Sequence, residues 1–240
     1  MPSLALLLLV GCKPLVVPPC AETSETACFK GVFRTLLGAP IEGMQICAPE
    51  LAEVDCTETD ANGGWRLPGL PRDTNVVLTA EHEKYVPSAF PQNTEMSWYD
   101  WYKVGVPQSS LEMNANRLDV EQRAGTGSLL FLTWEGLNTD GIDTPNVKDV
   151  ELTVRGGDGR VFYANGLGLA DAGATATQGS GLGGVLNLDP GIIEVRLEAP
   201  EGRCADETIF HYPADADGWI PVPILEGWNT AIDVQCPVAP

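Results

Sequence analysis

The sequence predicts an all-β protein in which two β-sandwich modules are joined by a short, partly helical linker. From Cys28 onward, apolar stretches of strand length alternate with turns rich in Gly, Pro, Asn and Asp. The 240 residues include 26 glycines and 19 prolines and suffice for one or two domains. We expect the modules at 28–105 and 126–240, with the linker at 106–125.

In the first module, the turns at 37–40 and 60–63 separate strands of typical length. The tight turn at 60–63 precedes Trp65, whose ring we expect in the core. Strands are expected near 29–36, 42–48, 53–59, 64–67, 74–80 and 84–89.

These segments carry a resemblance to a known family. Gly31-Val32-Phe33, the stretch 38–46, the stretch 59–67 and Gly69-Leu70-Pro71 together resemble the carboxypeptidase regulatory-like domain. The resemblance implies a transthyretin-like (prealbumin-like) β-sandwich of about seven strands. This chain departs from the family after Leu70-Pro71, where Arg72-Asp73 replaces the usual glycine.

The second module resembles the same family less closely. Val185 to Val195, with a turn at Pro190-Gly191, is similar to the late part of that domain, which indicates a divergent second copy. Strands are expected near 128–134, 149–155, 160–164, 184–188, 191–198, 207–211 and 230–235. In the linker, Ser109 and Glu112 have capping-box spacing, which predicts a helix near 110–119.

The N-terminus indicates export. The apolar run from Leu4 to Val10 is shorter than the ~20 residues that cross a bilayer, but it suits a signal peptide. Leu9-Val10-Gly11-Cys12 resembles the lipobox of bacterial lipoproteins, although no basic residue precedes the run. The resemblance implies a signal peptide at 1–11 and fatty acyl chains, palmitate among them, as a membrane anchor on Cys12. The alternative is a plain secretory signal.

Residues 12–27 contain three prolines and a polar run, which predict an extended tether. Lys13 replaces the aspartate that retains enterobacterial lipoproteins at the inner membrane. We therefore expect a location in the bacterial cell envelope, anchored to the outer membrane.

The cysteine content fits an oxidising compartment. Without the lipidated residue, six cysteines remain as disulfide candidates, and fifteen pairings are open. Proximity in sequence favours three pairs. These are Cys47 with Cys56, Cys204 with Cys236, and Cys20 with Cys28. The spacings do not match a zinc site.

Charge and motifs narrow the function. Acidic residues outnumber basic ones by 33 to 14, which argues against nucleic acid as a partner. The sequence contains two histidines, His82 and His211. It contains no nucleophile-elbow, metalloprotease or phosphate-loop motif. We therefore expect no enzyme and no cofactor. A hydrolase with an unrecognised acidic site remains the remote alternative.

An aromatic cluster lies between the modules and consists of Trp98, Tyr99, Trp101 and Tyr102. Such rings stack on sugars, so they are ligand-binding candidates for a glycan. The competing interpretation is packing, because strand alternation would bury at least one face of the cluster.

Two acidic turns offer weak calcium ligands, at Asp140 with Asp143 and at Asp215 with Asp217. Both fail the EF-hand pattern, so ordinary polar turns explain them better. An intramolecular isopeptide bond would need a buried lysine, an asparagine and an acidic residue together. On sequence, Lys30 is the candidate.

These features predict a lipid-anchored cell-envelope protein with a non-catalytic structural or binding role. Its partners would be the membrane, through the lipid, and another envelope protein or a glycan. A glycan-binding accessory protein is the main alternative.

Overall fold

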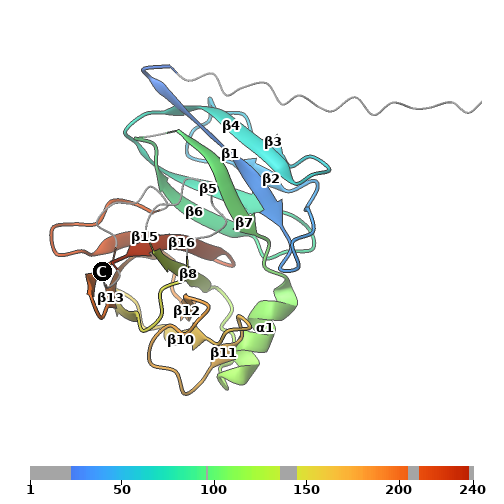
Figure 1. Ribbon diagram of the computed structural model, residues 1–240. Helices are drawn as coiled ribbons and strands as arrows, with labels where there is room; N and C mark the ends of the chain where they lie inside the picture. The colour runs from blue at the N-terminus through green and yellow to red at the C-terminus, as the bar shows by residue number, and fades with distance from the viewer. Residues whose placement is uncertain (1–22, 96, 136–144, 205–210, 238–240) are drawn as a thin grey trace, which may run out of the picture.

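The computed structural model describes residues 23–95, 97–135, 145–204 and 211–237. Within them the chain is an all-β protein with one ten-residue helix, so the predicted fold class is confirmed (Figure 1). Two β-sandwiches lie one above the other in this view. Cys12, Cys20, most of the tether and most of the expected strand at 207–211 lie outside the described residues.

The N-terminal sandwich is built from β1 to β7. Its smaller sheet has the order β4-β1-β7, with β7 parallel to β1 and β4 antiparallel to it. The facing sheet contributes β6, β5, β2 and β3. The bounds are β1 Thr26–Arg34, β2 Gln45–Cys47, β3 Thr57–Glu58, β4 Gly64–Pro71, β5 Asn75–Glu81, β6 Ser88–Asn93 and β7 Trp98–Val104.

The C-terminal sandwich is built from β8 to β16. In one of its sheets the central strand β13 pairs with β15 and β14 along one edge and with β9 along the opposite edge. The facing sheet has the order β11-β10-β12-β8-β16. The bounds are β8 Gly127–Glu135, β9 Glu151–Arg155, β10 Arg160–Ala164, β11 Ala170–Asp171, β12 Leu182–Leu188, β13 Gly191–Ala199, β14 Gly202–Arg203, β15 Ile220–Ile224 and β16 Asn229–Cys236.

The two sandwiches share one nine-stranded sheet, which the sequence did not predict. It runs β11-β10-β12-β8-β16-β6-β5-β2-β3, and its halves meet where β16 lies parallel to β6. At the junction, Asn229 pairs with Ser88 and Thr230 pairs with Ala89. The sheet therefore continues from one hydrophobic core to the other without a linker between them.

Each half of the shared sheet covers its own core. In the N-terminal half, Phe29, Trp65 and Phe90 are buried with Leu67 and Leu78. Along β4, the buried Trp65 and Leu67 alternate with partly buried residues, whereas the central residues of β5 and β6 are buried in succession. The C-terminal core is assembled in the same way. Its members include Leu129, Phe131, Val195, Leu197, Val222 and Val234.

The tight turn at 60–63 of the first sandwich forms as the sequence predicts. Asp60 Oδ1 accepts hydrogen bonds from the Asn62 and Gly64 amides, each at 2.8 Å, and Gly63 has φ of 75°. Trp65 is buried directly after this turn. Asp73, after Leu70-Pro71, adopts φ of 53°, a left-handed conformation that aspartate tolerates better than most residues.

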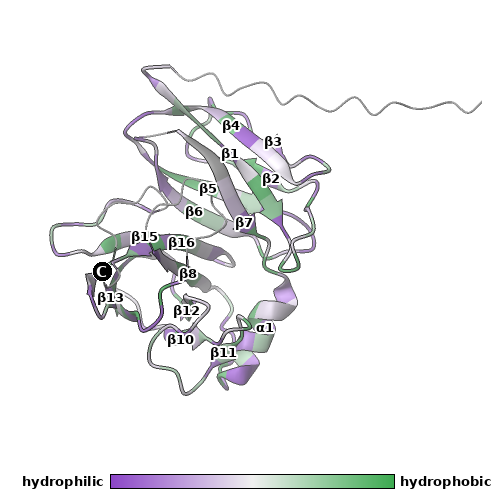
Figure 2. Cartoon of the chain, viewed as in Figure 1, coloured by the Kyte–Doolittle hydropathy of each residue, from purple (hydrophilic) through white to green (hydrophobic). Residues whose placement is uncertain are grey.

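The expected linker helix is present, but it begins two residues earlier than predicted and lacks the capping box. Helix α1 spans Gln108–Arg117, and its N-cap is Pro107, which makes no side-chain capping bond. Ser109 therefore lies inside the first turn instead of at its start. The helix carries both hydrophilic and hydrophobic residues along its length (Figure 2). Ala115, within the helix, and Leu118, its C-cap, pack on Phe162 of β10. This contact lies on the outer face of the shared sheet.

Strand β15 was missed in the sequence because it reads Ile-Pro-Val-Pro-Ile. Proline lacks the amide that a sheet interior needs, so the pattern argues against a strand. Here β15 lies at the edge of its sheet, and Pro221 and Pro223 pair opposite Glu194 and Ile192 of β13. The alternate residues Val222 and Ile224 enter the core.

Candidate functional site

Two disulfides are formed among the described cysteines. Cys47 is bonded to Cys56 across a short loop, and Cys204 is bonded to Cys236, with Cα–Cα distances of 4.4 and 4.1 Å. These are the pairs that proximity in sequence favoured. Cys28 is also disulfide-bonded, and its partner lies outside the described residues.

The aromatic cluster is split by strand β7. Trp101 is 3% exposed and packs edge-on against Trp65 and Phe90, with ring centroids 5.2 and 5.1 Å apart. Its ring belongs to the N-terminal core and is unavailable for stacking on a sugar. As a ligand-binding candidate, Trp101 is therefore wrong, because alternation along β7 turns it inward.

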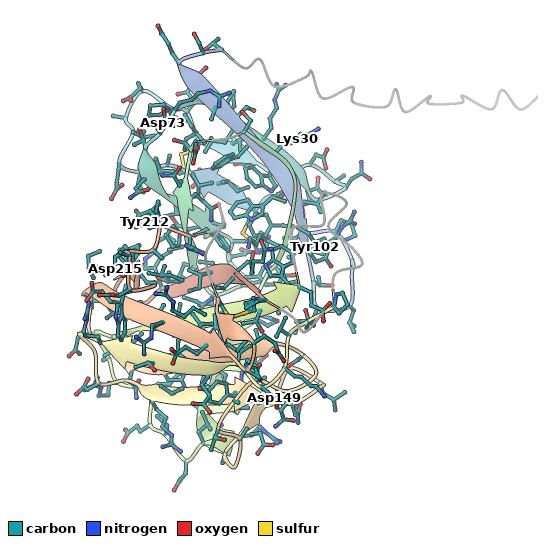
Figure 3. All side chains as sticks on the ribbon, turned by 60° about the vertical axis from the view of Figure 1, so that its left-hand side comes forward. Lys30, Asp73, Tyr102, Asp149, Tyr212 and Asp215 are labelled. Carbon is teal, nitrogen blue, oxygen red and sulfur yellow. A yellow bond between two sulfur atoms is a disulfide. The ribbon has the colours of Figure 1, made fainter. Side chains whose placement is uncertain are left out.

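Tyr102 is the next residue and points the other way. It is 46% exposed and lies at the level where the two sandwiches meet (Figure 3). The side chains of Trp98 and Tyr99 lie outside the described residues. Of the four proposed glycan contacts, Tyr102 is thus the one that the structure places at the surface.

A cavity of about 300 Å³ lies between the two sandwiches, and Tyr102 is one of the residues that line it. We call it the inter-sandwich groove. Strands β6 and β7 line it from the N-terminal sandwich, and β8, β12 and β16 line it from the C-terminal one. Most of its side chains are apolar, among them Leu36, Phe90, Val104, Leu130, Leu132 and Leu182.

Lys103 and Asp233 form a buried ion pair within this mainly apolar groove. Lys103 Nζ contacts Asp233 Oδ2, and the two side chains are 7% and 14% exposed. Lys103 Nζ also lies 4.8 Å from the centroid of the Trp101 ring and 5.4 Å from that of Phe90. Lys103 comes from β7 and Asp233 from β16, so the pair joins the two sandwiches across 130 residues of sequence.

His211 is a second buried titratable group. Burial lowers its pKa to about 4, although the charge of Asp233 and a hydrogen bond to the Tyr212 carbonyl oppose this shift. Nδ1 donates a hydrogen bond to that carbonyl, so in the neutral ring Nε2 is unprotonated and can only accept. Nε2 has no hydrogen-bond partner among the described atoms. His211 is therefore neutral at pH 7 and within electrostatic reach of the ion pair.

No catalytic triad is visible in the part of the chain that the structure describes. His82 Nδ1 accepts the Lys84 amide and its ring packs against Tyr85. Neither His82 nor His211 hydrogen-bonds a serine, threonine or cysteine side chain there.

A second cavity of about 220 Å³ lies between α1 and the loop around Gly125.

The acidic turn at Asp215 is occupied by the backbone. Asp215 Oδ1 accepts the amides of Asp217 and Trp219, both at 2.9 Å, as in an ordinary Asx turn. Within the described ranges, no group of three or more His, Cys, Asp or Glu side chains is placed to hold a metal ion. Asp140 and Asp143 lie outside those ranges.

Lys30 is not the buried lysine that an isopeptide bond requires. It lies on β1, paired with Arg66 of β4, and is only half-buried, higher on the N-terminal sandwich than Tyr102 (Figure 3). Lys103 has the burial and the carboxylate neighbour. Sequence reasoning missed it because its partner is 130 residues away; its place next to the buried Trp101 was the only local signal.

No family model matches the chain, and no curated protein matches it. Solved structures with a similar course of chain include the Bacillus anthracis TIE protein, with 11% identity and a TM-score of 0.26 over 88% of this chain. This chain spans 34% of that protein.

No helix in the described residues is long and apolar enough to cross a bilayer.

Two pilins give similar values. The shaft pilin spaA from Lactobacillus rhamnosus GG has 8% identity and a TM-score of 0.24, covering 91% of this chain and all of that one. The Streptococcal ancillary pilin has 12% identity and a TM-score of 0.25, covering 91% and 64%. Likeness at this level assigns no function to this chain.

Proposed function

We propose that this protein is a non-catalytic structural module of the bacterial cell envelope. In this proposal, lipid on Cys12 holds it at the outer membrane, and its two sandwiches act as one rigid spacer that presents a partner-binding surface. The observation that carries the proposal is the nine-stranded sheet that runs through both sandwiches.

Rigidity is supported at three levels. The backbone ladder continues from β8 through β16 to β6, and β8 pairs with β16 over eight residues. The ion pair of Lys103 and Asp233 spans the groove beside this ladder. Trp134 and Ala231, from the C-terminal half, pack against the N-terminal core. A hinge between the sandwiches would have to break all three.

The disulfides and the net charge support a role outside the cytoplasm. Two described disulfides and a disulfide-bonded Cys28 fit an oxidising compartment. A formal charge of −19 favours solubility and disfavours polyanionic partners. With no triad or metal cluster in the described ranges, a binding role accounts for more of the structure than an enzymatic one.

Rigidity is testable by the distance between two spin labels. Leu37 and Leu167 are 97% and 84% exposed and lie on different sandwiches, so cysteines placed there accept labels without disturbing a core. We expect a narrow distance distribution by double electron–electron resonance. The matched control pair is Leu167 with Ile192, both on the C-terminal sandwich. A distribution much broader than the control would contradict a rigid spacer.

The anchor is tested separately. Metabolic labelling with an alkyne fatty acid should mark the wild-type chain and spare Cys12→Ser, and the variant should leave the membrane fraction. A membrane-bound, unlabelled wild type would refute the lipid while leaving the rigidity result intact.

A glycan-binding role is the alternative, and Tyr102 is its best remaining residue. One exposed ring beside an apolar groove is a weaker platform than the two tryptophans that the sequence offered. Binding on a glycan array that Tyr102→Ala abolishes would favour the alternative over the structural role.

A further inference from the structure

The geometry at the floor of the inter-sandwich groove brings an amine against a carboxyl group. Lys103 Nζ contacts Asp233 Oδ2, and both side chains are almost wholly removed from water. The Phe90 and Trp101 rings cover the ammonium on one side. Asp233 lies in the middle of β16, and Lys103 lies next to the C-terminal end of β7, where it still pairs with Phe33 of β1. Backbone pairing of both strands therefore restricts the separation of the two groups.

The burial of this ion pair carries a free-energy cost. Removing an ammonium and a carboxylate from water carries a desolvation penalty that their mutual attraction offsets only partly. Transfer of one proton from Nζ to the carboxylate gives a neutral amine and a neutral acid. Those are the forms in which an amine attacks a carboxyl carbon.

We propose that Lys103 and Asp233 form an intramolecular isopeptide bond. Nζ forms a bond to Cγ of Asp233, the bond from Cγ to one carboxyl oxygen breaks, and that oxygen leaves as water with two protons from the ammonium. The reaction is neutral overall, needs no oxidant or cofactor, and gains from the fixed approach of the two reacting groups.

The bond would convert an electrostatic contact between the sandwiches into a covalent one. It would tie β7, in the small sheet of the N-terminal sandwich, to β16, in the middle of the shared sheet. Unlike a salt bridge it would persist in denaturant, and unlike the disulfides it would persist under reduction. The inference does not depend on the lipid anchor.

Trypsin gives a direct test on the full chain. Cleavage after Lys84, Lys103, Arg117 and Arg203 yields the peptides 85–103, 104–117 and 204–240. Acylation of Lys103 blocks cleavage there, so we expect a single branched species that joins 85–117 to 204–240 and is lighter than their sum by one water. The peptide 85–117 contains no cysteine, so a disulfide cannot mimic this link.

Variants separate the chemistry from its imitators. Asp233→Asn should give the same branched product, now by loss of ammonia, whereas Lys103→Arg should be cut at position 103 and show no link. Lys30→Arg, which alters the half-buried lysine of β1, should retain the link. Dehydration of Asp233 to a cyclic imide would also remove one water, but the two peptides would separate.

The wild-type digest decides the question even if a variant fails to fold. Recovery of the branched peptide after denaturation and reduction establishes the bond. Recovery of unlinked 85–103, 104–117 and 204–240 from folded wild-type protein overturns the proposal.

Discussion

Replacing Trp101 by alanine separates a core aromatic from a ligand-binding one. Its neighbour Tyr102 lies on the opposite face of β7 and is mostly outside the core, so Tyr102→Ala is a matched control one residue away. If the cluster serves packing, stability should depend on Trp101 and hardly at all on Tyr102.

The structure sets the size of the effect. Trp101 is 3% exposed and makes edge-on contacts with Trp65 and Phe90 at 5.2 and 5.1 Å. Truncating such a ring to alanine costs about 3–5 kcal/mol, of which each aromatic pair supplies about 0.5–1.5 kcal/mol. For a chain of this length, that corresponds to a fall in Tm of roughly 10 °C. Tyr102→Ala should change stability by less than about 1 kcal/mol.

Thermal and urea unfolding, followed by tryptophan fluorescence and far-ultraviolet circular dichroism, measure both variants against the wild type. A Trp101→Ala protein with an unchanged midpoint would refute the packing of this ring in the N-terminal core. A large loss for Tyr102→Ala would contradict its placement at the surface of the groove.

Three further changes test other parts of the fold. Gly31→Ala places a Cβ 2.0 Å from the Trp101 carbonyl oxygen and should destabilise by more than about 2 kcal/mol, whereas Gly166→Ala, with nothing within 4 Å, should be near neutral in urea unfolding. Cys204→Ser with Cys236→Ser opens a loop of 32 residues and should cost about 3–4 kcal/mol, measured by urea unfolding against the oxidised wild type. His211 has a folded pKa of about 4 against 6.5 when unfolded, so the unfolded state takes up the proton first as pH falls. Stability should therefore drop by about 2 kcal/mol from pH 7 to pH 5, and a slope unaltered in His211→Gln would contradict this cause.

The features that were predictable from sequence are local ones. Turns at Asp60–Gly63 and the strand at 160–164 depend on nearby residues, because turn chemistry and strand alternation act over a few positions. The disulfide of Cys47 and Cys56 closes a loop short enough to be inferred from spacing. The all-β class follows from the repetition of such signals along the chain.

The features that were missed depend on distant residues. Nothing local in Ser88 or Asn229 indicates that β6 and β16 are neighbours, so two separate modules were expected where one sheet runs through both. The contact of Lys103 with Asp233 joins positions 130 residues apart. Strand β15 was not predicted because it contains two prolines, and proline in a sequence is compatible with either an edge strand or a loop.

The position of β16 in the shared sheet determines when the molecule can finish folding. This strand comes later in the chain than every strand it joins, yet it lies between β6 and β8. A chain that emerges N-terminus first, from a ribosome or an export channel, leaves β6 and β8 as open edges until residues 229–236 arrive. Non-local parallel pairing is slow because long loops must close first. The two halves are therefore assembled by the last strand, after synthesis or passage across a membrane is nearly complete.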